Sequence, residues 1–427
     1  MTEGNLKLRH RQHWKRFPKQ KRGLLKMNAK IQTLKELYPE DLLGYSHKLT
    51  EGEVAVLSEL RVSLEKHLRP VLTDFYERGT FPFDEFYKVV ADVNFMNDDR
   101  IFEGRENKLK TSELFNAFLY LELARFDASI ATFFTVHGGL CLNTILVGGS
   151  EEQINEFVPK LRSFEYQGCF GLTEPDHGSD IAGGLATSAK RVGDKWILNG
   201  EKRWIGGSDT ADIIPIFARD TEDNKIKCFI VRKGAPGYKA EVIPHKGSLR
   251  MIHNGHITLD NVEVSEADRL PNIEGFKSVN DILTFTRADI AHLAMGVSAG
   301  SFIAAHKYVT EREQFGKKLA SFQLVQEKLV RMQSNFVANL GYSVQLSHLQ
   351  EEGDALMTNS ALAKMHNSLN MRENVALGRE ICGGNGITLE ADVMRFFLDA
   401  EAVYTYEGTH EINALIVGRA ITGVGAF

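Results

Sequence analysis

The sequence contains no proline after Pro271, although it continues to residue 427. Proline removes a backbone donor and interrupts helices, so a proline-free stretch of this length favours helix. Apolar residues recur within it at helical spacing, as at Leu329, Met332 and Phe336. We therefore predict a bundle of about four helices in the last third of the chain.

The sequence is also poor in cysteine. Its four cysteines are far apart and form no Cys-x-x-Cys pair. This spacing argues against a disulfide framework and a cysteine-based zinc site, and it fits a reducing compartment. His137, His177 and His410 belong to no recognisable metal-binding pattern, so we expect hydrogen-bonding histidines and no metal.

Several nucleotide and catalytic motifs are missing. No Gly-x-Gly-x-x-Gly follows a predicted strand, and strands do not alternate with helices, so there is no evident nicotinamide site. The chain also lacks a Walker loop, a His-Glu-x-x-His and a Gly-x-Ser-x-Gly. No apolar stretch approaches the roughly 20 residues that a bilayer requires, so we expect no membrane span. A net charge of -5 gives no general argument for nucleic acid.

Charge is nevertheless uneven, because ten basic residues precede position 31 and the only acid among them is Glu3. We interpret this segment as a solvated basic tail. A mitochondrial presequence is the alternative, but this segment is rich in Lys and has no Ser before Ser46. We therefore favour a bacterial cytoplasmic protein, with the mitochondrial matrix as the second choice, and an RNA-binding arm stays open.

The middle of the chain has a different pattern. The runs KWIL, IIPIF and CFIV at 195–198, 213–217 and 228–231 are short, apolar and separated by turn signals. Residues 192–195 and 198–201 have the Gly and Asn content of hairpin turns. These features predict a small antiparallel β domain.

Helical patterns return ahead of this β domain, where Ser112 opens an apolar helix. The expected order is a basic N-terminal extension at 1–45 and an N-terminal all-α domain at 46–166. A middle antiparallel β domain at 167–275 and a C-terminal four-helix bundle at 276–427 follow.

The run TYEGTHE at 405–411 places a carboxylate, Glu407, between an aromatic ring and a glycine. The ring excludes water and raises the affinity of the acid for a proton, while Gly408 lets a ligand reach the backbone. Glu407 is therefore a candidate general base. A surface turn is the alternative for these residues taken alone.

Three other segments have the composition of ligand loops. LTEPDHGSD at 172–180 offers hydroxyl and backbone N–H groups to a polar ring edge or a phosphate, and an ordinary turn is equally open. Trp204 can pack against one face of a planar ligand or lie buried in a hydrophobic core. REQFG at 312–316 can clamp a pyrophosphate or cap a helix, and CGGNG at 382–386 lets the backbone approach a ligand closely.

Taken together, LTEPxxGSD, RWI, RxQFG, GGNG and YEGT, in this order, resemble the flavin-dependent acyl-CoA dehydrogenase and oxidase family. The resemblance covers about 49–427. It implies two α-helical domains flanking a β domain, FAD bound between subunits, and a homotetramer or homodimer. It also implies that Glu407 removes the α-proton of an acyl-CoA while the β-hydrogen leaves as hydride to the flavin, which yields the trans-2-enoyl-CoA.

The resemblance assigns the remaining site residues. The flavin-contacting positions of the β domain are Thr173, Gly178, Ser179 and Trp204. The positions that reach the FAD of a neighbouring subunit are Arg312, Gln314 and Phe315. Further cofactor-binding positions are Gln323, Gly383, Gly384, Thr409 and Glu411. The substrate-binding positions are Arg287, Tyr406 and Gly408. Some relatives carry the catalytic carboxylate at the position of Thr286, which is not acidic here, so Glu407 remains the candidate.

Within the family, the C-terminal motif is closest to glutaryl-CoA dehydrogenases and plant short-chain acyl-CoA oxidases. The glutaryl enzymes use an arginine and a serine to hold the distal carboxylate, and this chain has Ala131 and Thr132 there. A second carboxylate buried without its cation costs on the order of several kcal/mol. We therefore reject glutarate and favour an unbranched short or medium acyl chain, with Phe133 and Phe134 shortening the pocket.

A second departure concerns Gly206, because many dehydrogenases of the family have threonine there, near flavin N5, whereas the plant oxidases have glycine. The loss of this side chain would alter the flavin potential or leave room for O2. The final residues, Gly425-Ala426-Phe427, are not a peroxisomal address. We therefore favour a dehydrogenase that passes electrons to electron-transfer flavoprotein, with an oxidase as the alternative. A scaffold or a nucleic-acid-binding protein on this fold would be expected to have lost the base or the flavin contacts.

Overall fold

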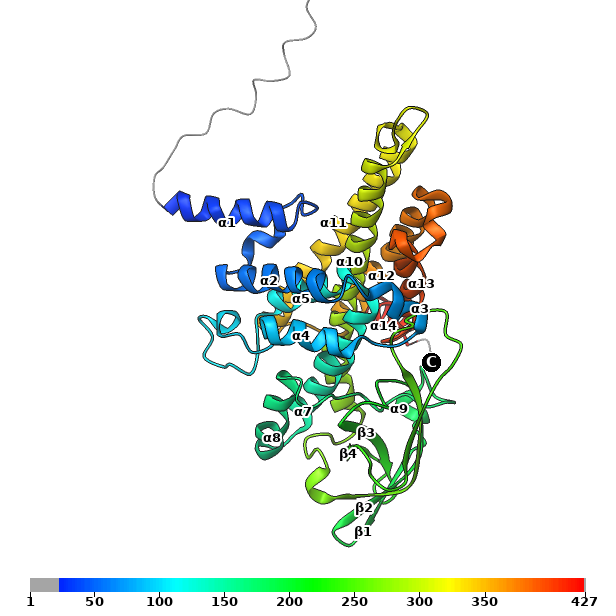
Figure 1. Ribbon diagram of the computed structural model, residues 1–427. Helices are drawn as coiled ribbons and strands as arrows, with labels where there is room; N and C mark the ends of the chain where they lie inside the picture. Colours follow the sequence, from blue (N-terminus) through cyan, green and yellow to red (C-terminus); the bar gives the residue numbers. More distant parts are fainter. Residues whose placement is uncertain (1–22, 426–427) are drawn as a thin grey trace, which may run out of the picture.

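The computed structural model describes residues 23–425, which run from helices through a sheet to a second set of helices (Figure 1). The basic residues at 7–22 lie outside this range. The first helical part comprises α1 (Gly23–Leu37), η1 (Tyr45–Lys48), α2 (Glu51–His67), α3 (Leu72–Arg78), α4 (Phe83–Val93), η2 (Asp99–Phe102), α5 (Glu113–Phe126), α6 (Ala128–Phe134), the π-helix η3 (Thr135–Cys141), α7 (Leu142–Gly148) and α8 (Glu151–Arg162).

Local signals at helix starts explain two of these helices. The side chain of Thr50 accepts the Glu53 N–H while the Glu53 carboxylate accepts the Thr50 N–H, which forms a capping box at the start of α2. Ser112 accepts the Phe115 N–H over 2.9 Å and caps α5, as its position in the sequence predicts.

Two helical stretches in the described residues are long and apolar enough to cross a membrane, 128–148 and α10 (Phe276–Glu311). The expectation that no apolar stretch reaches such a length was therefore wrong for these two segments. In their most apolar windows, 78% and 83% of the residues are buried inside the protein. Core helices pass the same length test, and this burial accounts for their composition.

The sheet follows these helices and comprises β1 (Ser188–Val192), β2 (Lys195–Gly206), β3 (Ile213–Asp220), β4 (Ile226–Arg232), β5 (Tyr238–Val242) and β6 (Asn254–Ser265). Short helical pieces, α9 (Ile181–Gly184) and η4 (Glu266–Asp268), flank it. The strand order is β4-β3-β1-β2-β6-β5. All neighbours are antiparallel except β1 and β3, which pair in parallel, so the sheet is mixed rather than wholly antiparallel.

One predicted turn is present and the other is wrong. Val192 pairs with Lys195 across a two-residue turn in which Gly193 has φ +65°. Residues 198–201, by contrast, continue through β2, and the register against β6 shifts between Leu198 and Gly200. A Cβ at Gly200 would lie 2.7 Å from Thr187 Cα, so this glycine permits a bulge and a close backbone approach.

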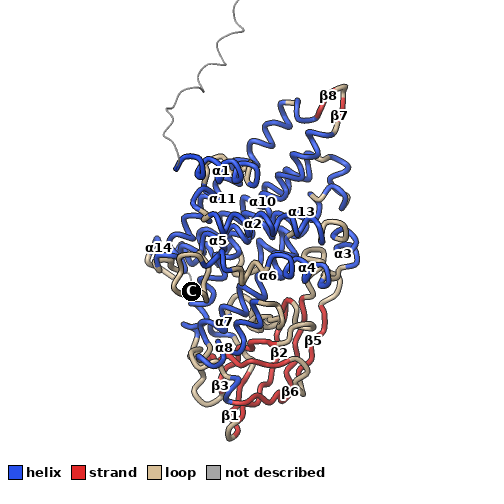
Figure 2. Tube along the Cα trace, turned by 60° about the vertical axis from the view of Figure 1, so that its left-hand side comes forward, coloured by secondary structure: helices blue, strands red, loops and turns tan. Residues whose placement is uncertain are grey.

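The last part of the chain forms the predicted helical bundle. It comprises α10, α11 (Gln323–Glu352), α12 (Met357–Ile381), α13 (Val393–Thr405) and α14 (His410–Thr422), with the short helices η5 (Leu319–Ser321), η6 (Gly383–Ile387) and η7 (Leu389–Ala391). Between α10 and α11, β7 (Glu313–Gln314) and β8 (Lys317–Lys318) form a hairpin. This hairpin lies at the end of the molecule opposite the six-stranded sheet (Figures 1 and 2).

Candidate active site

Glu407 lies in the loop 406–409, which joins α13 to α14. Its φ of +56° is in the left-handed region, and Gly408 follows at +82°. Such a conformation costs a non-glycine residue on the order of 1–3 kcal/mol and persists only where surrounding contacts hold it. Thr409 closes the loop, because its hydroxyl accepts the Ile412 N–H over 3.2 Å and caps α14.

The carboxylate of Glu407 contacts α10. The Thr286 hydroxyl donates to Glu407 Oε2 over 2.9 Å. Burial raises the pKa of Glu407, while the charge of Arg287, the Thr286 hydrogen bond and the charge of Lys364 lower it, and the net pKa lies above the usual value. The carboxylate therefore has the increased affinity for a proton that a general base requires.

Arg287 follows Thr286 on α10 and contacts the backbone of the same loop. Its Nε donates to the Glu407 carbonyl over 3.3 Å, and its Nη1 approaches Met357 Sδ closely. Burial lowers the pKa of this guanidinium while Glu407 raises it. Both residues that the resemblance placed beside the base, Arg287 and the non-acidic Thr286, therefore contact it.

Tyr406 points the other way, toward α6. Its hydroxyl lies 3.1 Å from Thr132 Oγ1, and Thr132 itself donates to the Ala128 carbonyl over 2.8 Å. A hydroxyl has one proton, so Tyr406 is the donor in this pair. Burial raises the pKa of Tyr406 and keeps this donor protonated. Ala131, next to Thr132, is completely buried.

The segment 172–180 is held to the sheet by a buried carboxylate that sequence reasoning did not single out. Glu174 accepts the N–H groups of Ala186 and Thr187 over 2.7 and 2.9 Å, and Lys202 Nζ donates to it over 2.8 Å. The Arg203 N–H donates to the Thr173 carbonyl over 2.8 Å. These bonds fix the backbone on which the predicted ligand groups are mounted.

The ligand groups of that segment lie at the surface. Gly178 and Ser179 are exposed, and no atom lies within 4 Å of the position that a Cβ on Gly178 would occupy. Trp204 has φ +66° and leaves 53% of its surface exposed, so it is not the core tryptophan of the alternative interpretation. Large exposed aromatic rings beside polar loops are suited to stacking on a planar ligand.

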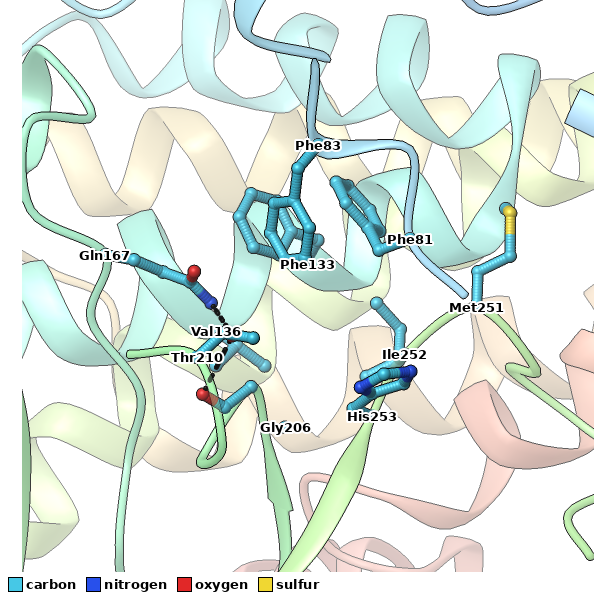
Figure 3. Close-up of a pocket in the computed structure, with 11 residues that line it drawn as sticks. Phe81, Phe83, Phe133, Val136, Gln167, Gly206, Thr210, Met251, Ile252 and His253 are labelled. Carbon is cyan, nitrogen blue, oxygen red and sulfur yellow. Dashed lines mark hydrogen bonds between the residues drawn. The ribbon is translucent and has the colours of Figure 1, made fainter. Parts of the chain in front are cut away.

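Gly206 lies against apolar side chains. A Cβ there would lie 3.1 Å from Val136 Cγ2 and 3.5 Å from Ile252 Cγ2. Beside it is a small, mostly apolar cavity with a volume of about 20 Å³, shown in Figure 3. Its lining includes Phe81, Phe83 and Phe133, whose rings pack together, and centroids of Phe81 and Phe133 are 4.3 Å apart. A threonine side chain at position 206 would therefore come into tight contact with Val136.

The remaining predicted cofactor residues lie elsewhere. Phe315, at the turn of the β7–β8 hairpin, has φ +52° and is 91% exposed, and Arg312 and Gln314 are exposed with it. This hairpin lies at the end of the molecule opposite the six-stranded sheet, whose strand β2 carries Trp204 (Figures 1 and 2). One chain therefore does not bring these two groups together. Other predicted positions that are exposed are Gln323, Gly383, Gly384 and Glu411.

Two further residues hold the loop 406–409, and the sequence did not indicate either. Lys364 Nζ donates to the Tyr404 and Gly408 carbonyls over 2.7 and 2.8 Å. Asn413 Nδ2 donates to the Gly408 carbonyl over 2.8 Å and to the Thr409 carbonyl over 3.0 Å. The only available signal was a lysine on the buried face of an amphipathic helix, which is weak without knowledge of the facing loop.

The histidine interpretation holds for His137, which is fully buried. Its Nε2 donates to the Leu161 carbonyl over 2.8 Å, and its Nδ1 accepts the Gly168 N–H over 3.1 Å. Burial lowers its pKa to about 4, so the ring is neutral. Within residues 23–425, no group of three or more His, Cys, Asp or Glu side chains is arranged to hold a metal ion.

The fold and the site define a class of protein: an α–β–α enzyme with a partly buried carboxylate in a strained loop of its C-terminal bundle. Family models described as the N-terminal, middle and C-terminal domains of acyl-CoA dehydrogenase match residues 50–165, 169–262 and 274–422. The chain belongs to the acyl-CoA dehydrogenase family.

Individual relatives agree. An acyl-CoA dehydrogenase of Bacillus subtilis is 32% identical over 71% of this chain and 80% of its own length. The structure of a glutaryl-CoA dehydrogenase from Mycobacterium smegmatis in complex with FADH2 has a TM-score of 0.85 and 32% identity over 91% of this chain and 99% of that chain. Butyryl-CoA dehydrogenase from Megasphaera elsdenii gives a TM-score of 0.81 and 28% identity over 88% and 99%.

Proposed function

We propose that this protein is an FAD-dependent acyl-CoA dehydrogenase that converts a short- or medium-chain acyl-CoA to the trans-2-enoyl-CoA. The observation that carries the proposal is the partly buried Glu407 carboxylate, whose pKa is raised and which accepts a hydrogen bond from Thr286. Glu407 removes the α-proton of the thioester. Arg287, bonded to the Glu407 carbonyl, keeps the loop in place as the proton is transferred.

The thioester oxygen needs a donor while the α-proton leaves, because negative charge develops on it. Among the described residues, the Glu407 N–H has no hydrogen-bond acceptor. The strained φ of +56° at Glu407 presents this N–H together with the carboxylate in one loop. We assign the N–H to the thioester oxygen.

The residues present fit FAD. Trp204 and Phe315 are large aromatic side chains left 53% and 91% exposed, and the turn at 383–384 has open space above both glycines. Thr173, Ser179 and Trp204 would hold the flavin of their own subunit, and Arg312, Gln314 and Phe315 that of a neighbour. FAD, when bound, accepts the β-hydrogen as a hydride. The separation of the two groups supports a homodimer or homotetramer.

An unbranched acyl chain suits the residues that surround Tyr406. Ala131 is buried and supplies no charge, and the Thr132 hydroxyl is already hydrogen-bonded to Tyr406. The nearby cations Arg287 and Lys364 donate to backbone carbonyls of the loop that carries the base. Because Ala131 stands where the glutaryl enzymes have an arginine, a distal carboxylate would be buried there without that cation, which disfavours glutaryl-CoA.

The proposed acceptor is electron-transfer flavoprotein rather than O2. Val136 and Ile252 lie close to Gly206, which supports a site shielded from O2. The proposed location remains the bacterial cytoplasm, on the Lys-rich and Ser-poor composition of the basic segment.

The test is the flavin spectrum during anaerobic addition of butyryl-CoA, followed by admission of air. A dehydrogenase bleaches and stays reduced in air, whereas immediate recovery with peroxide would mean an oxidase. Glu407→Gln should keep the flavin and bind acyl-CoA, yet lose about 10²–10⁴-fold in the rate of bleaching. Glu390→Gln, an exposed carboxylate outside the site, is the matched control. Undiminished bleaching by the Glu407 variant would overturn the assignment of the base.

A further inference from the structure

Lys364 is a completely buried lysine on α12 that contacts the chain on both sides of the base. Its ammonium donates over 2.7 Å to the Tyr404 carbonyl and over 2.8 Å to the Gly408 carbonyl. Burying a cation is costly unless it is bonded to acceptors. Here both acceptors are backbone carbonyls, one before and one after Glu407, so the position of this side chain is coupled to the conformation of the loop.

The loop needs such support. Glu407 and Gly408 have φ values of +56° and +82°, and the first of these is unfavourable for a residue with a side chain. Arg287 bonds the Glu407 carbonyl, and Asn413 bonds the Gly408 and Thr409 carbonyls. Among the described residues, Lys364 alone links the end of α13 to the residue that follows the base.

The charge of Lys364 also acts on Glu407. The ammonium lowers the pKa of Glu407, and Glu407 in turn raises the pKa of Lys364 against the larger effect of burial. The net effect brings the pKa of Lys364 to about 7. Arg287 lowers this pKa further and Glu411 raises it.

The ring centroid of Tyr404 lies 5.9 Å from Nζ, within the range of a cation–π contact. The titratable and charged groups around this pair are Arg287 on α10, Tyr404 on α13, Tyr406 in the loop, Glu411 on α14 and, through its effect on Glu407, Asp289 on α10.

We propose that Lys364 is a positioning residue for the reaction: it holds the Tyr404 and Gly408 carbonyls on either side of Glu407 and, in its protonated form, places a positive charge near the carboxylate. This inference rests on the proposed role of Glu407 as the base. Lys364 touches no reacting atom. It acts by fixing the loop from which the carboxylate and the Glu407 N–H reach the substrate.

The first test is the pH dependence of flavin reduction by butyryl-CoA in the holoenzyme, for Lys364→Met, Lys364→Arg and wild type. Loss of the positive charge favours the protonated acid, so the acid limb of the Lys364→Met profile should move to higher pH. For each pH unit by which the acid limb moves, the rate of flavin reduction at pH values below the limb should fall about tenfold. At pH values well above the limb the rate should not change. Lys364→Arg, which keeps the charge, should return the limb toward wild type. Lys227→Met, in the sheet, controls for loss of a lysine that bonds a buried carboxylate.

A merely structural role gives a different result: a lower rate by the same factor at every pH, an unmoved limb and no rescue by arginine. That result would overturn the proposal. Affinity for an acyl-CoA thioether, which lacks the carbonyl, should be unchanged in Lys364→Met, because Lys364 does not contact the ligand.

The second test does not depend on turnover and uses thermal unfolding of wild type, Lys364→Gln, Glu407→Gln and the double variant. If the two side chains interact, the loss of Tm caused by Lys364→Gln differs between the wild-type background and the Glu407→Gln background. Equal losses in both backgrounds would overturn the inference. If none of the acyl-CoAs tested bleaches the flavin of the wild type, the proposed reaction is wrong. The double-variant comparison of Tm values still decides whether Lys364 is coupled to Glu407.

Discussion

The hydroxyl of Thr286 donates to Glu407 Oε2 over 2.9 Å and links α10 to the loop between α13 and α14. This bond stabilises the ionised form of the carboxylate, because a hydroxyl donor favours an acceptor that carries charge. It opposes the desolvation that raises the pKa of Glu407. The reactivity of the base is therefore a balance between burial and a few specific donors.

Replacing Thr286 by valine should disturb that balance without a large change in volume. The carboxylate loses a donor to its charged form, so the pKa of Glu407 rises further and the acid limb of flavin reduction moves upward by about one pH unit. Thr310→Val, at an exposed position near the far end of α10, is the control. Stopped-flow measurement of flavin reduction at a series of pH values on both sides of the acid limb checks this. An unmoved limb with normal thermal stability would contradict it.

Glu407 should also make stability depend on pH. Its pKa in the folded protein lies above the ordinary value of 4.5, so the folded state holds this proton more tightly than the unfolded state. Its contribution to stability is therefore present below the unfolded pKa and is lost as pH rises through the folded pKa.

Glu407→Gln removes this effect, so the variant should gain stability relative to wild type as pH rises above about 4.5. Thermal unfolding of both proteins from about pH 4.5 to 8 measures the difference. A difference in Tm that is constant over this range would contradict the raised pKa.

Gly206→Thr should destabilise the protein by about 1–3 kcal/mol, because the added side chain meets Val136 and Ile252 in a packed region. Val136→Ala should relieve much of this in the double variant, since the nearest contact is Val136 Cγ2 at 3.1 Å. Denaturant unfolding of the two single variants and the double variant gives the coupling. Additive losses would mean that Val136 is not the obstacle.

Phe315→Ala should reduce flavin retention while leaving the fold of the subunit intact, because this ring is 91% exposed. The measurement is the flavin-to-protein absorbance ratio after gel filtration, together with the Tm of the flavin-free protein. Leu324→Ala is a matched control, since this apolar residue is 77% exposed near the same hairpin. Equal flavin content in both variants would remove Phe315 from the cofactor site.

The sequence indicated the order of the elements and several contacts of the site. Proline distribution and apolar periodicity predicted the helical bundle, because those signals act within a few turns of one helix. The hairpin at 192–195 was predictable for the same reason. The absence of a turn at 198–201 was not predictable, because the conformation of Gly200 depends on its contacts with Thr187 and β6 rather than on its neighbours in sequence.

By itself, then, the sequence determined the family pattern and the candidate base Glu407, and it singled out Arg287 and Thr286 as residues related to that base. Only the tertiary structure decided that Val136 packs against Gly206 and that Lys364 bonds the Tyr404 and Gly408 carbonyls on either side of Glu407. Both are contacts between residues far apart in the chain, formed by packing in three dimensions. A hydrogen bond to a backbone carbonyl depends on the direction of that carbonyl, which residue type does not encode.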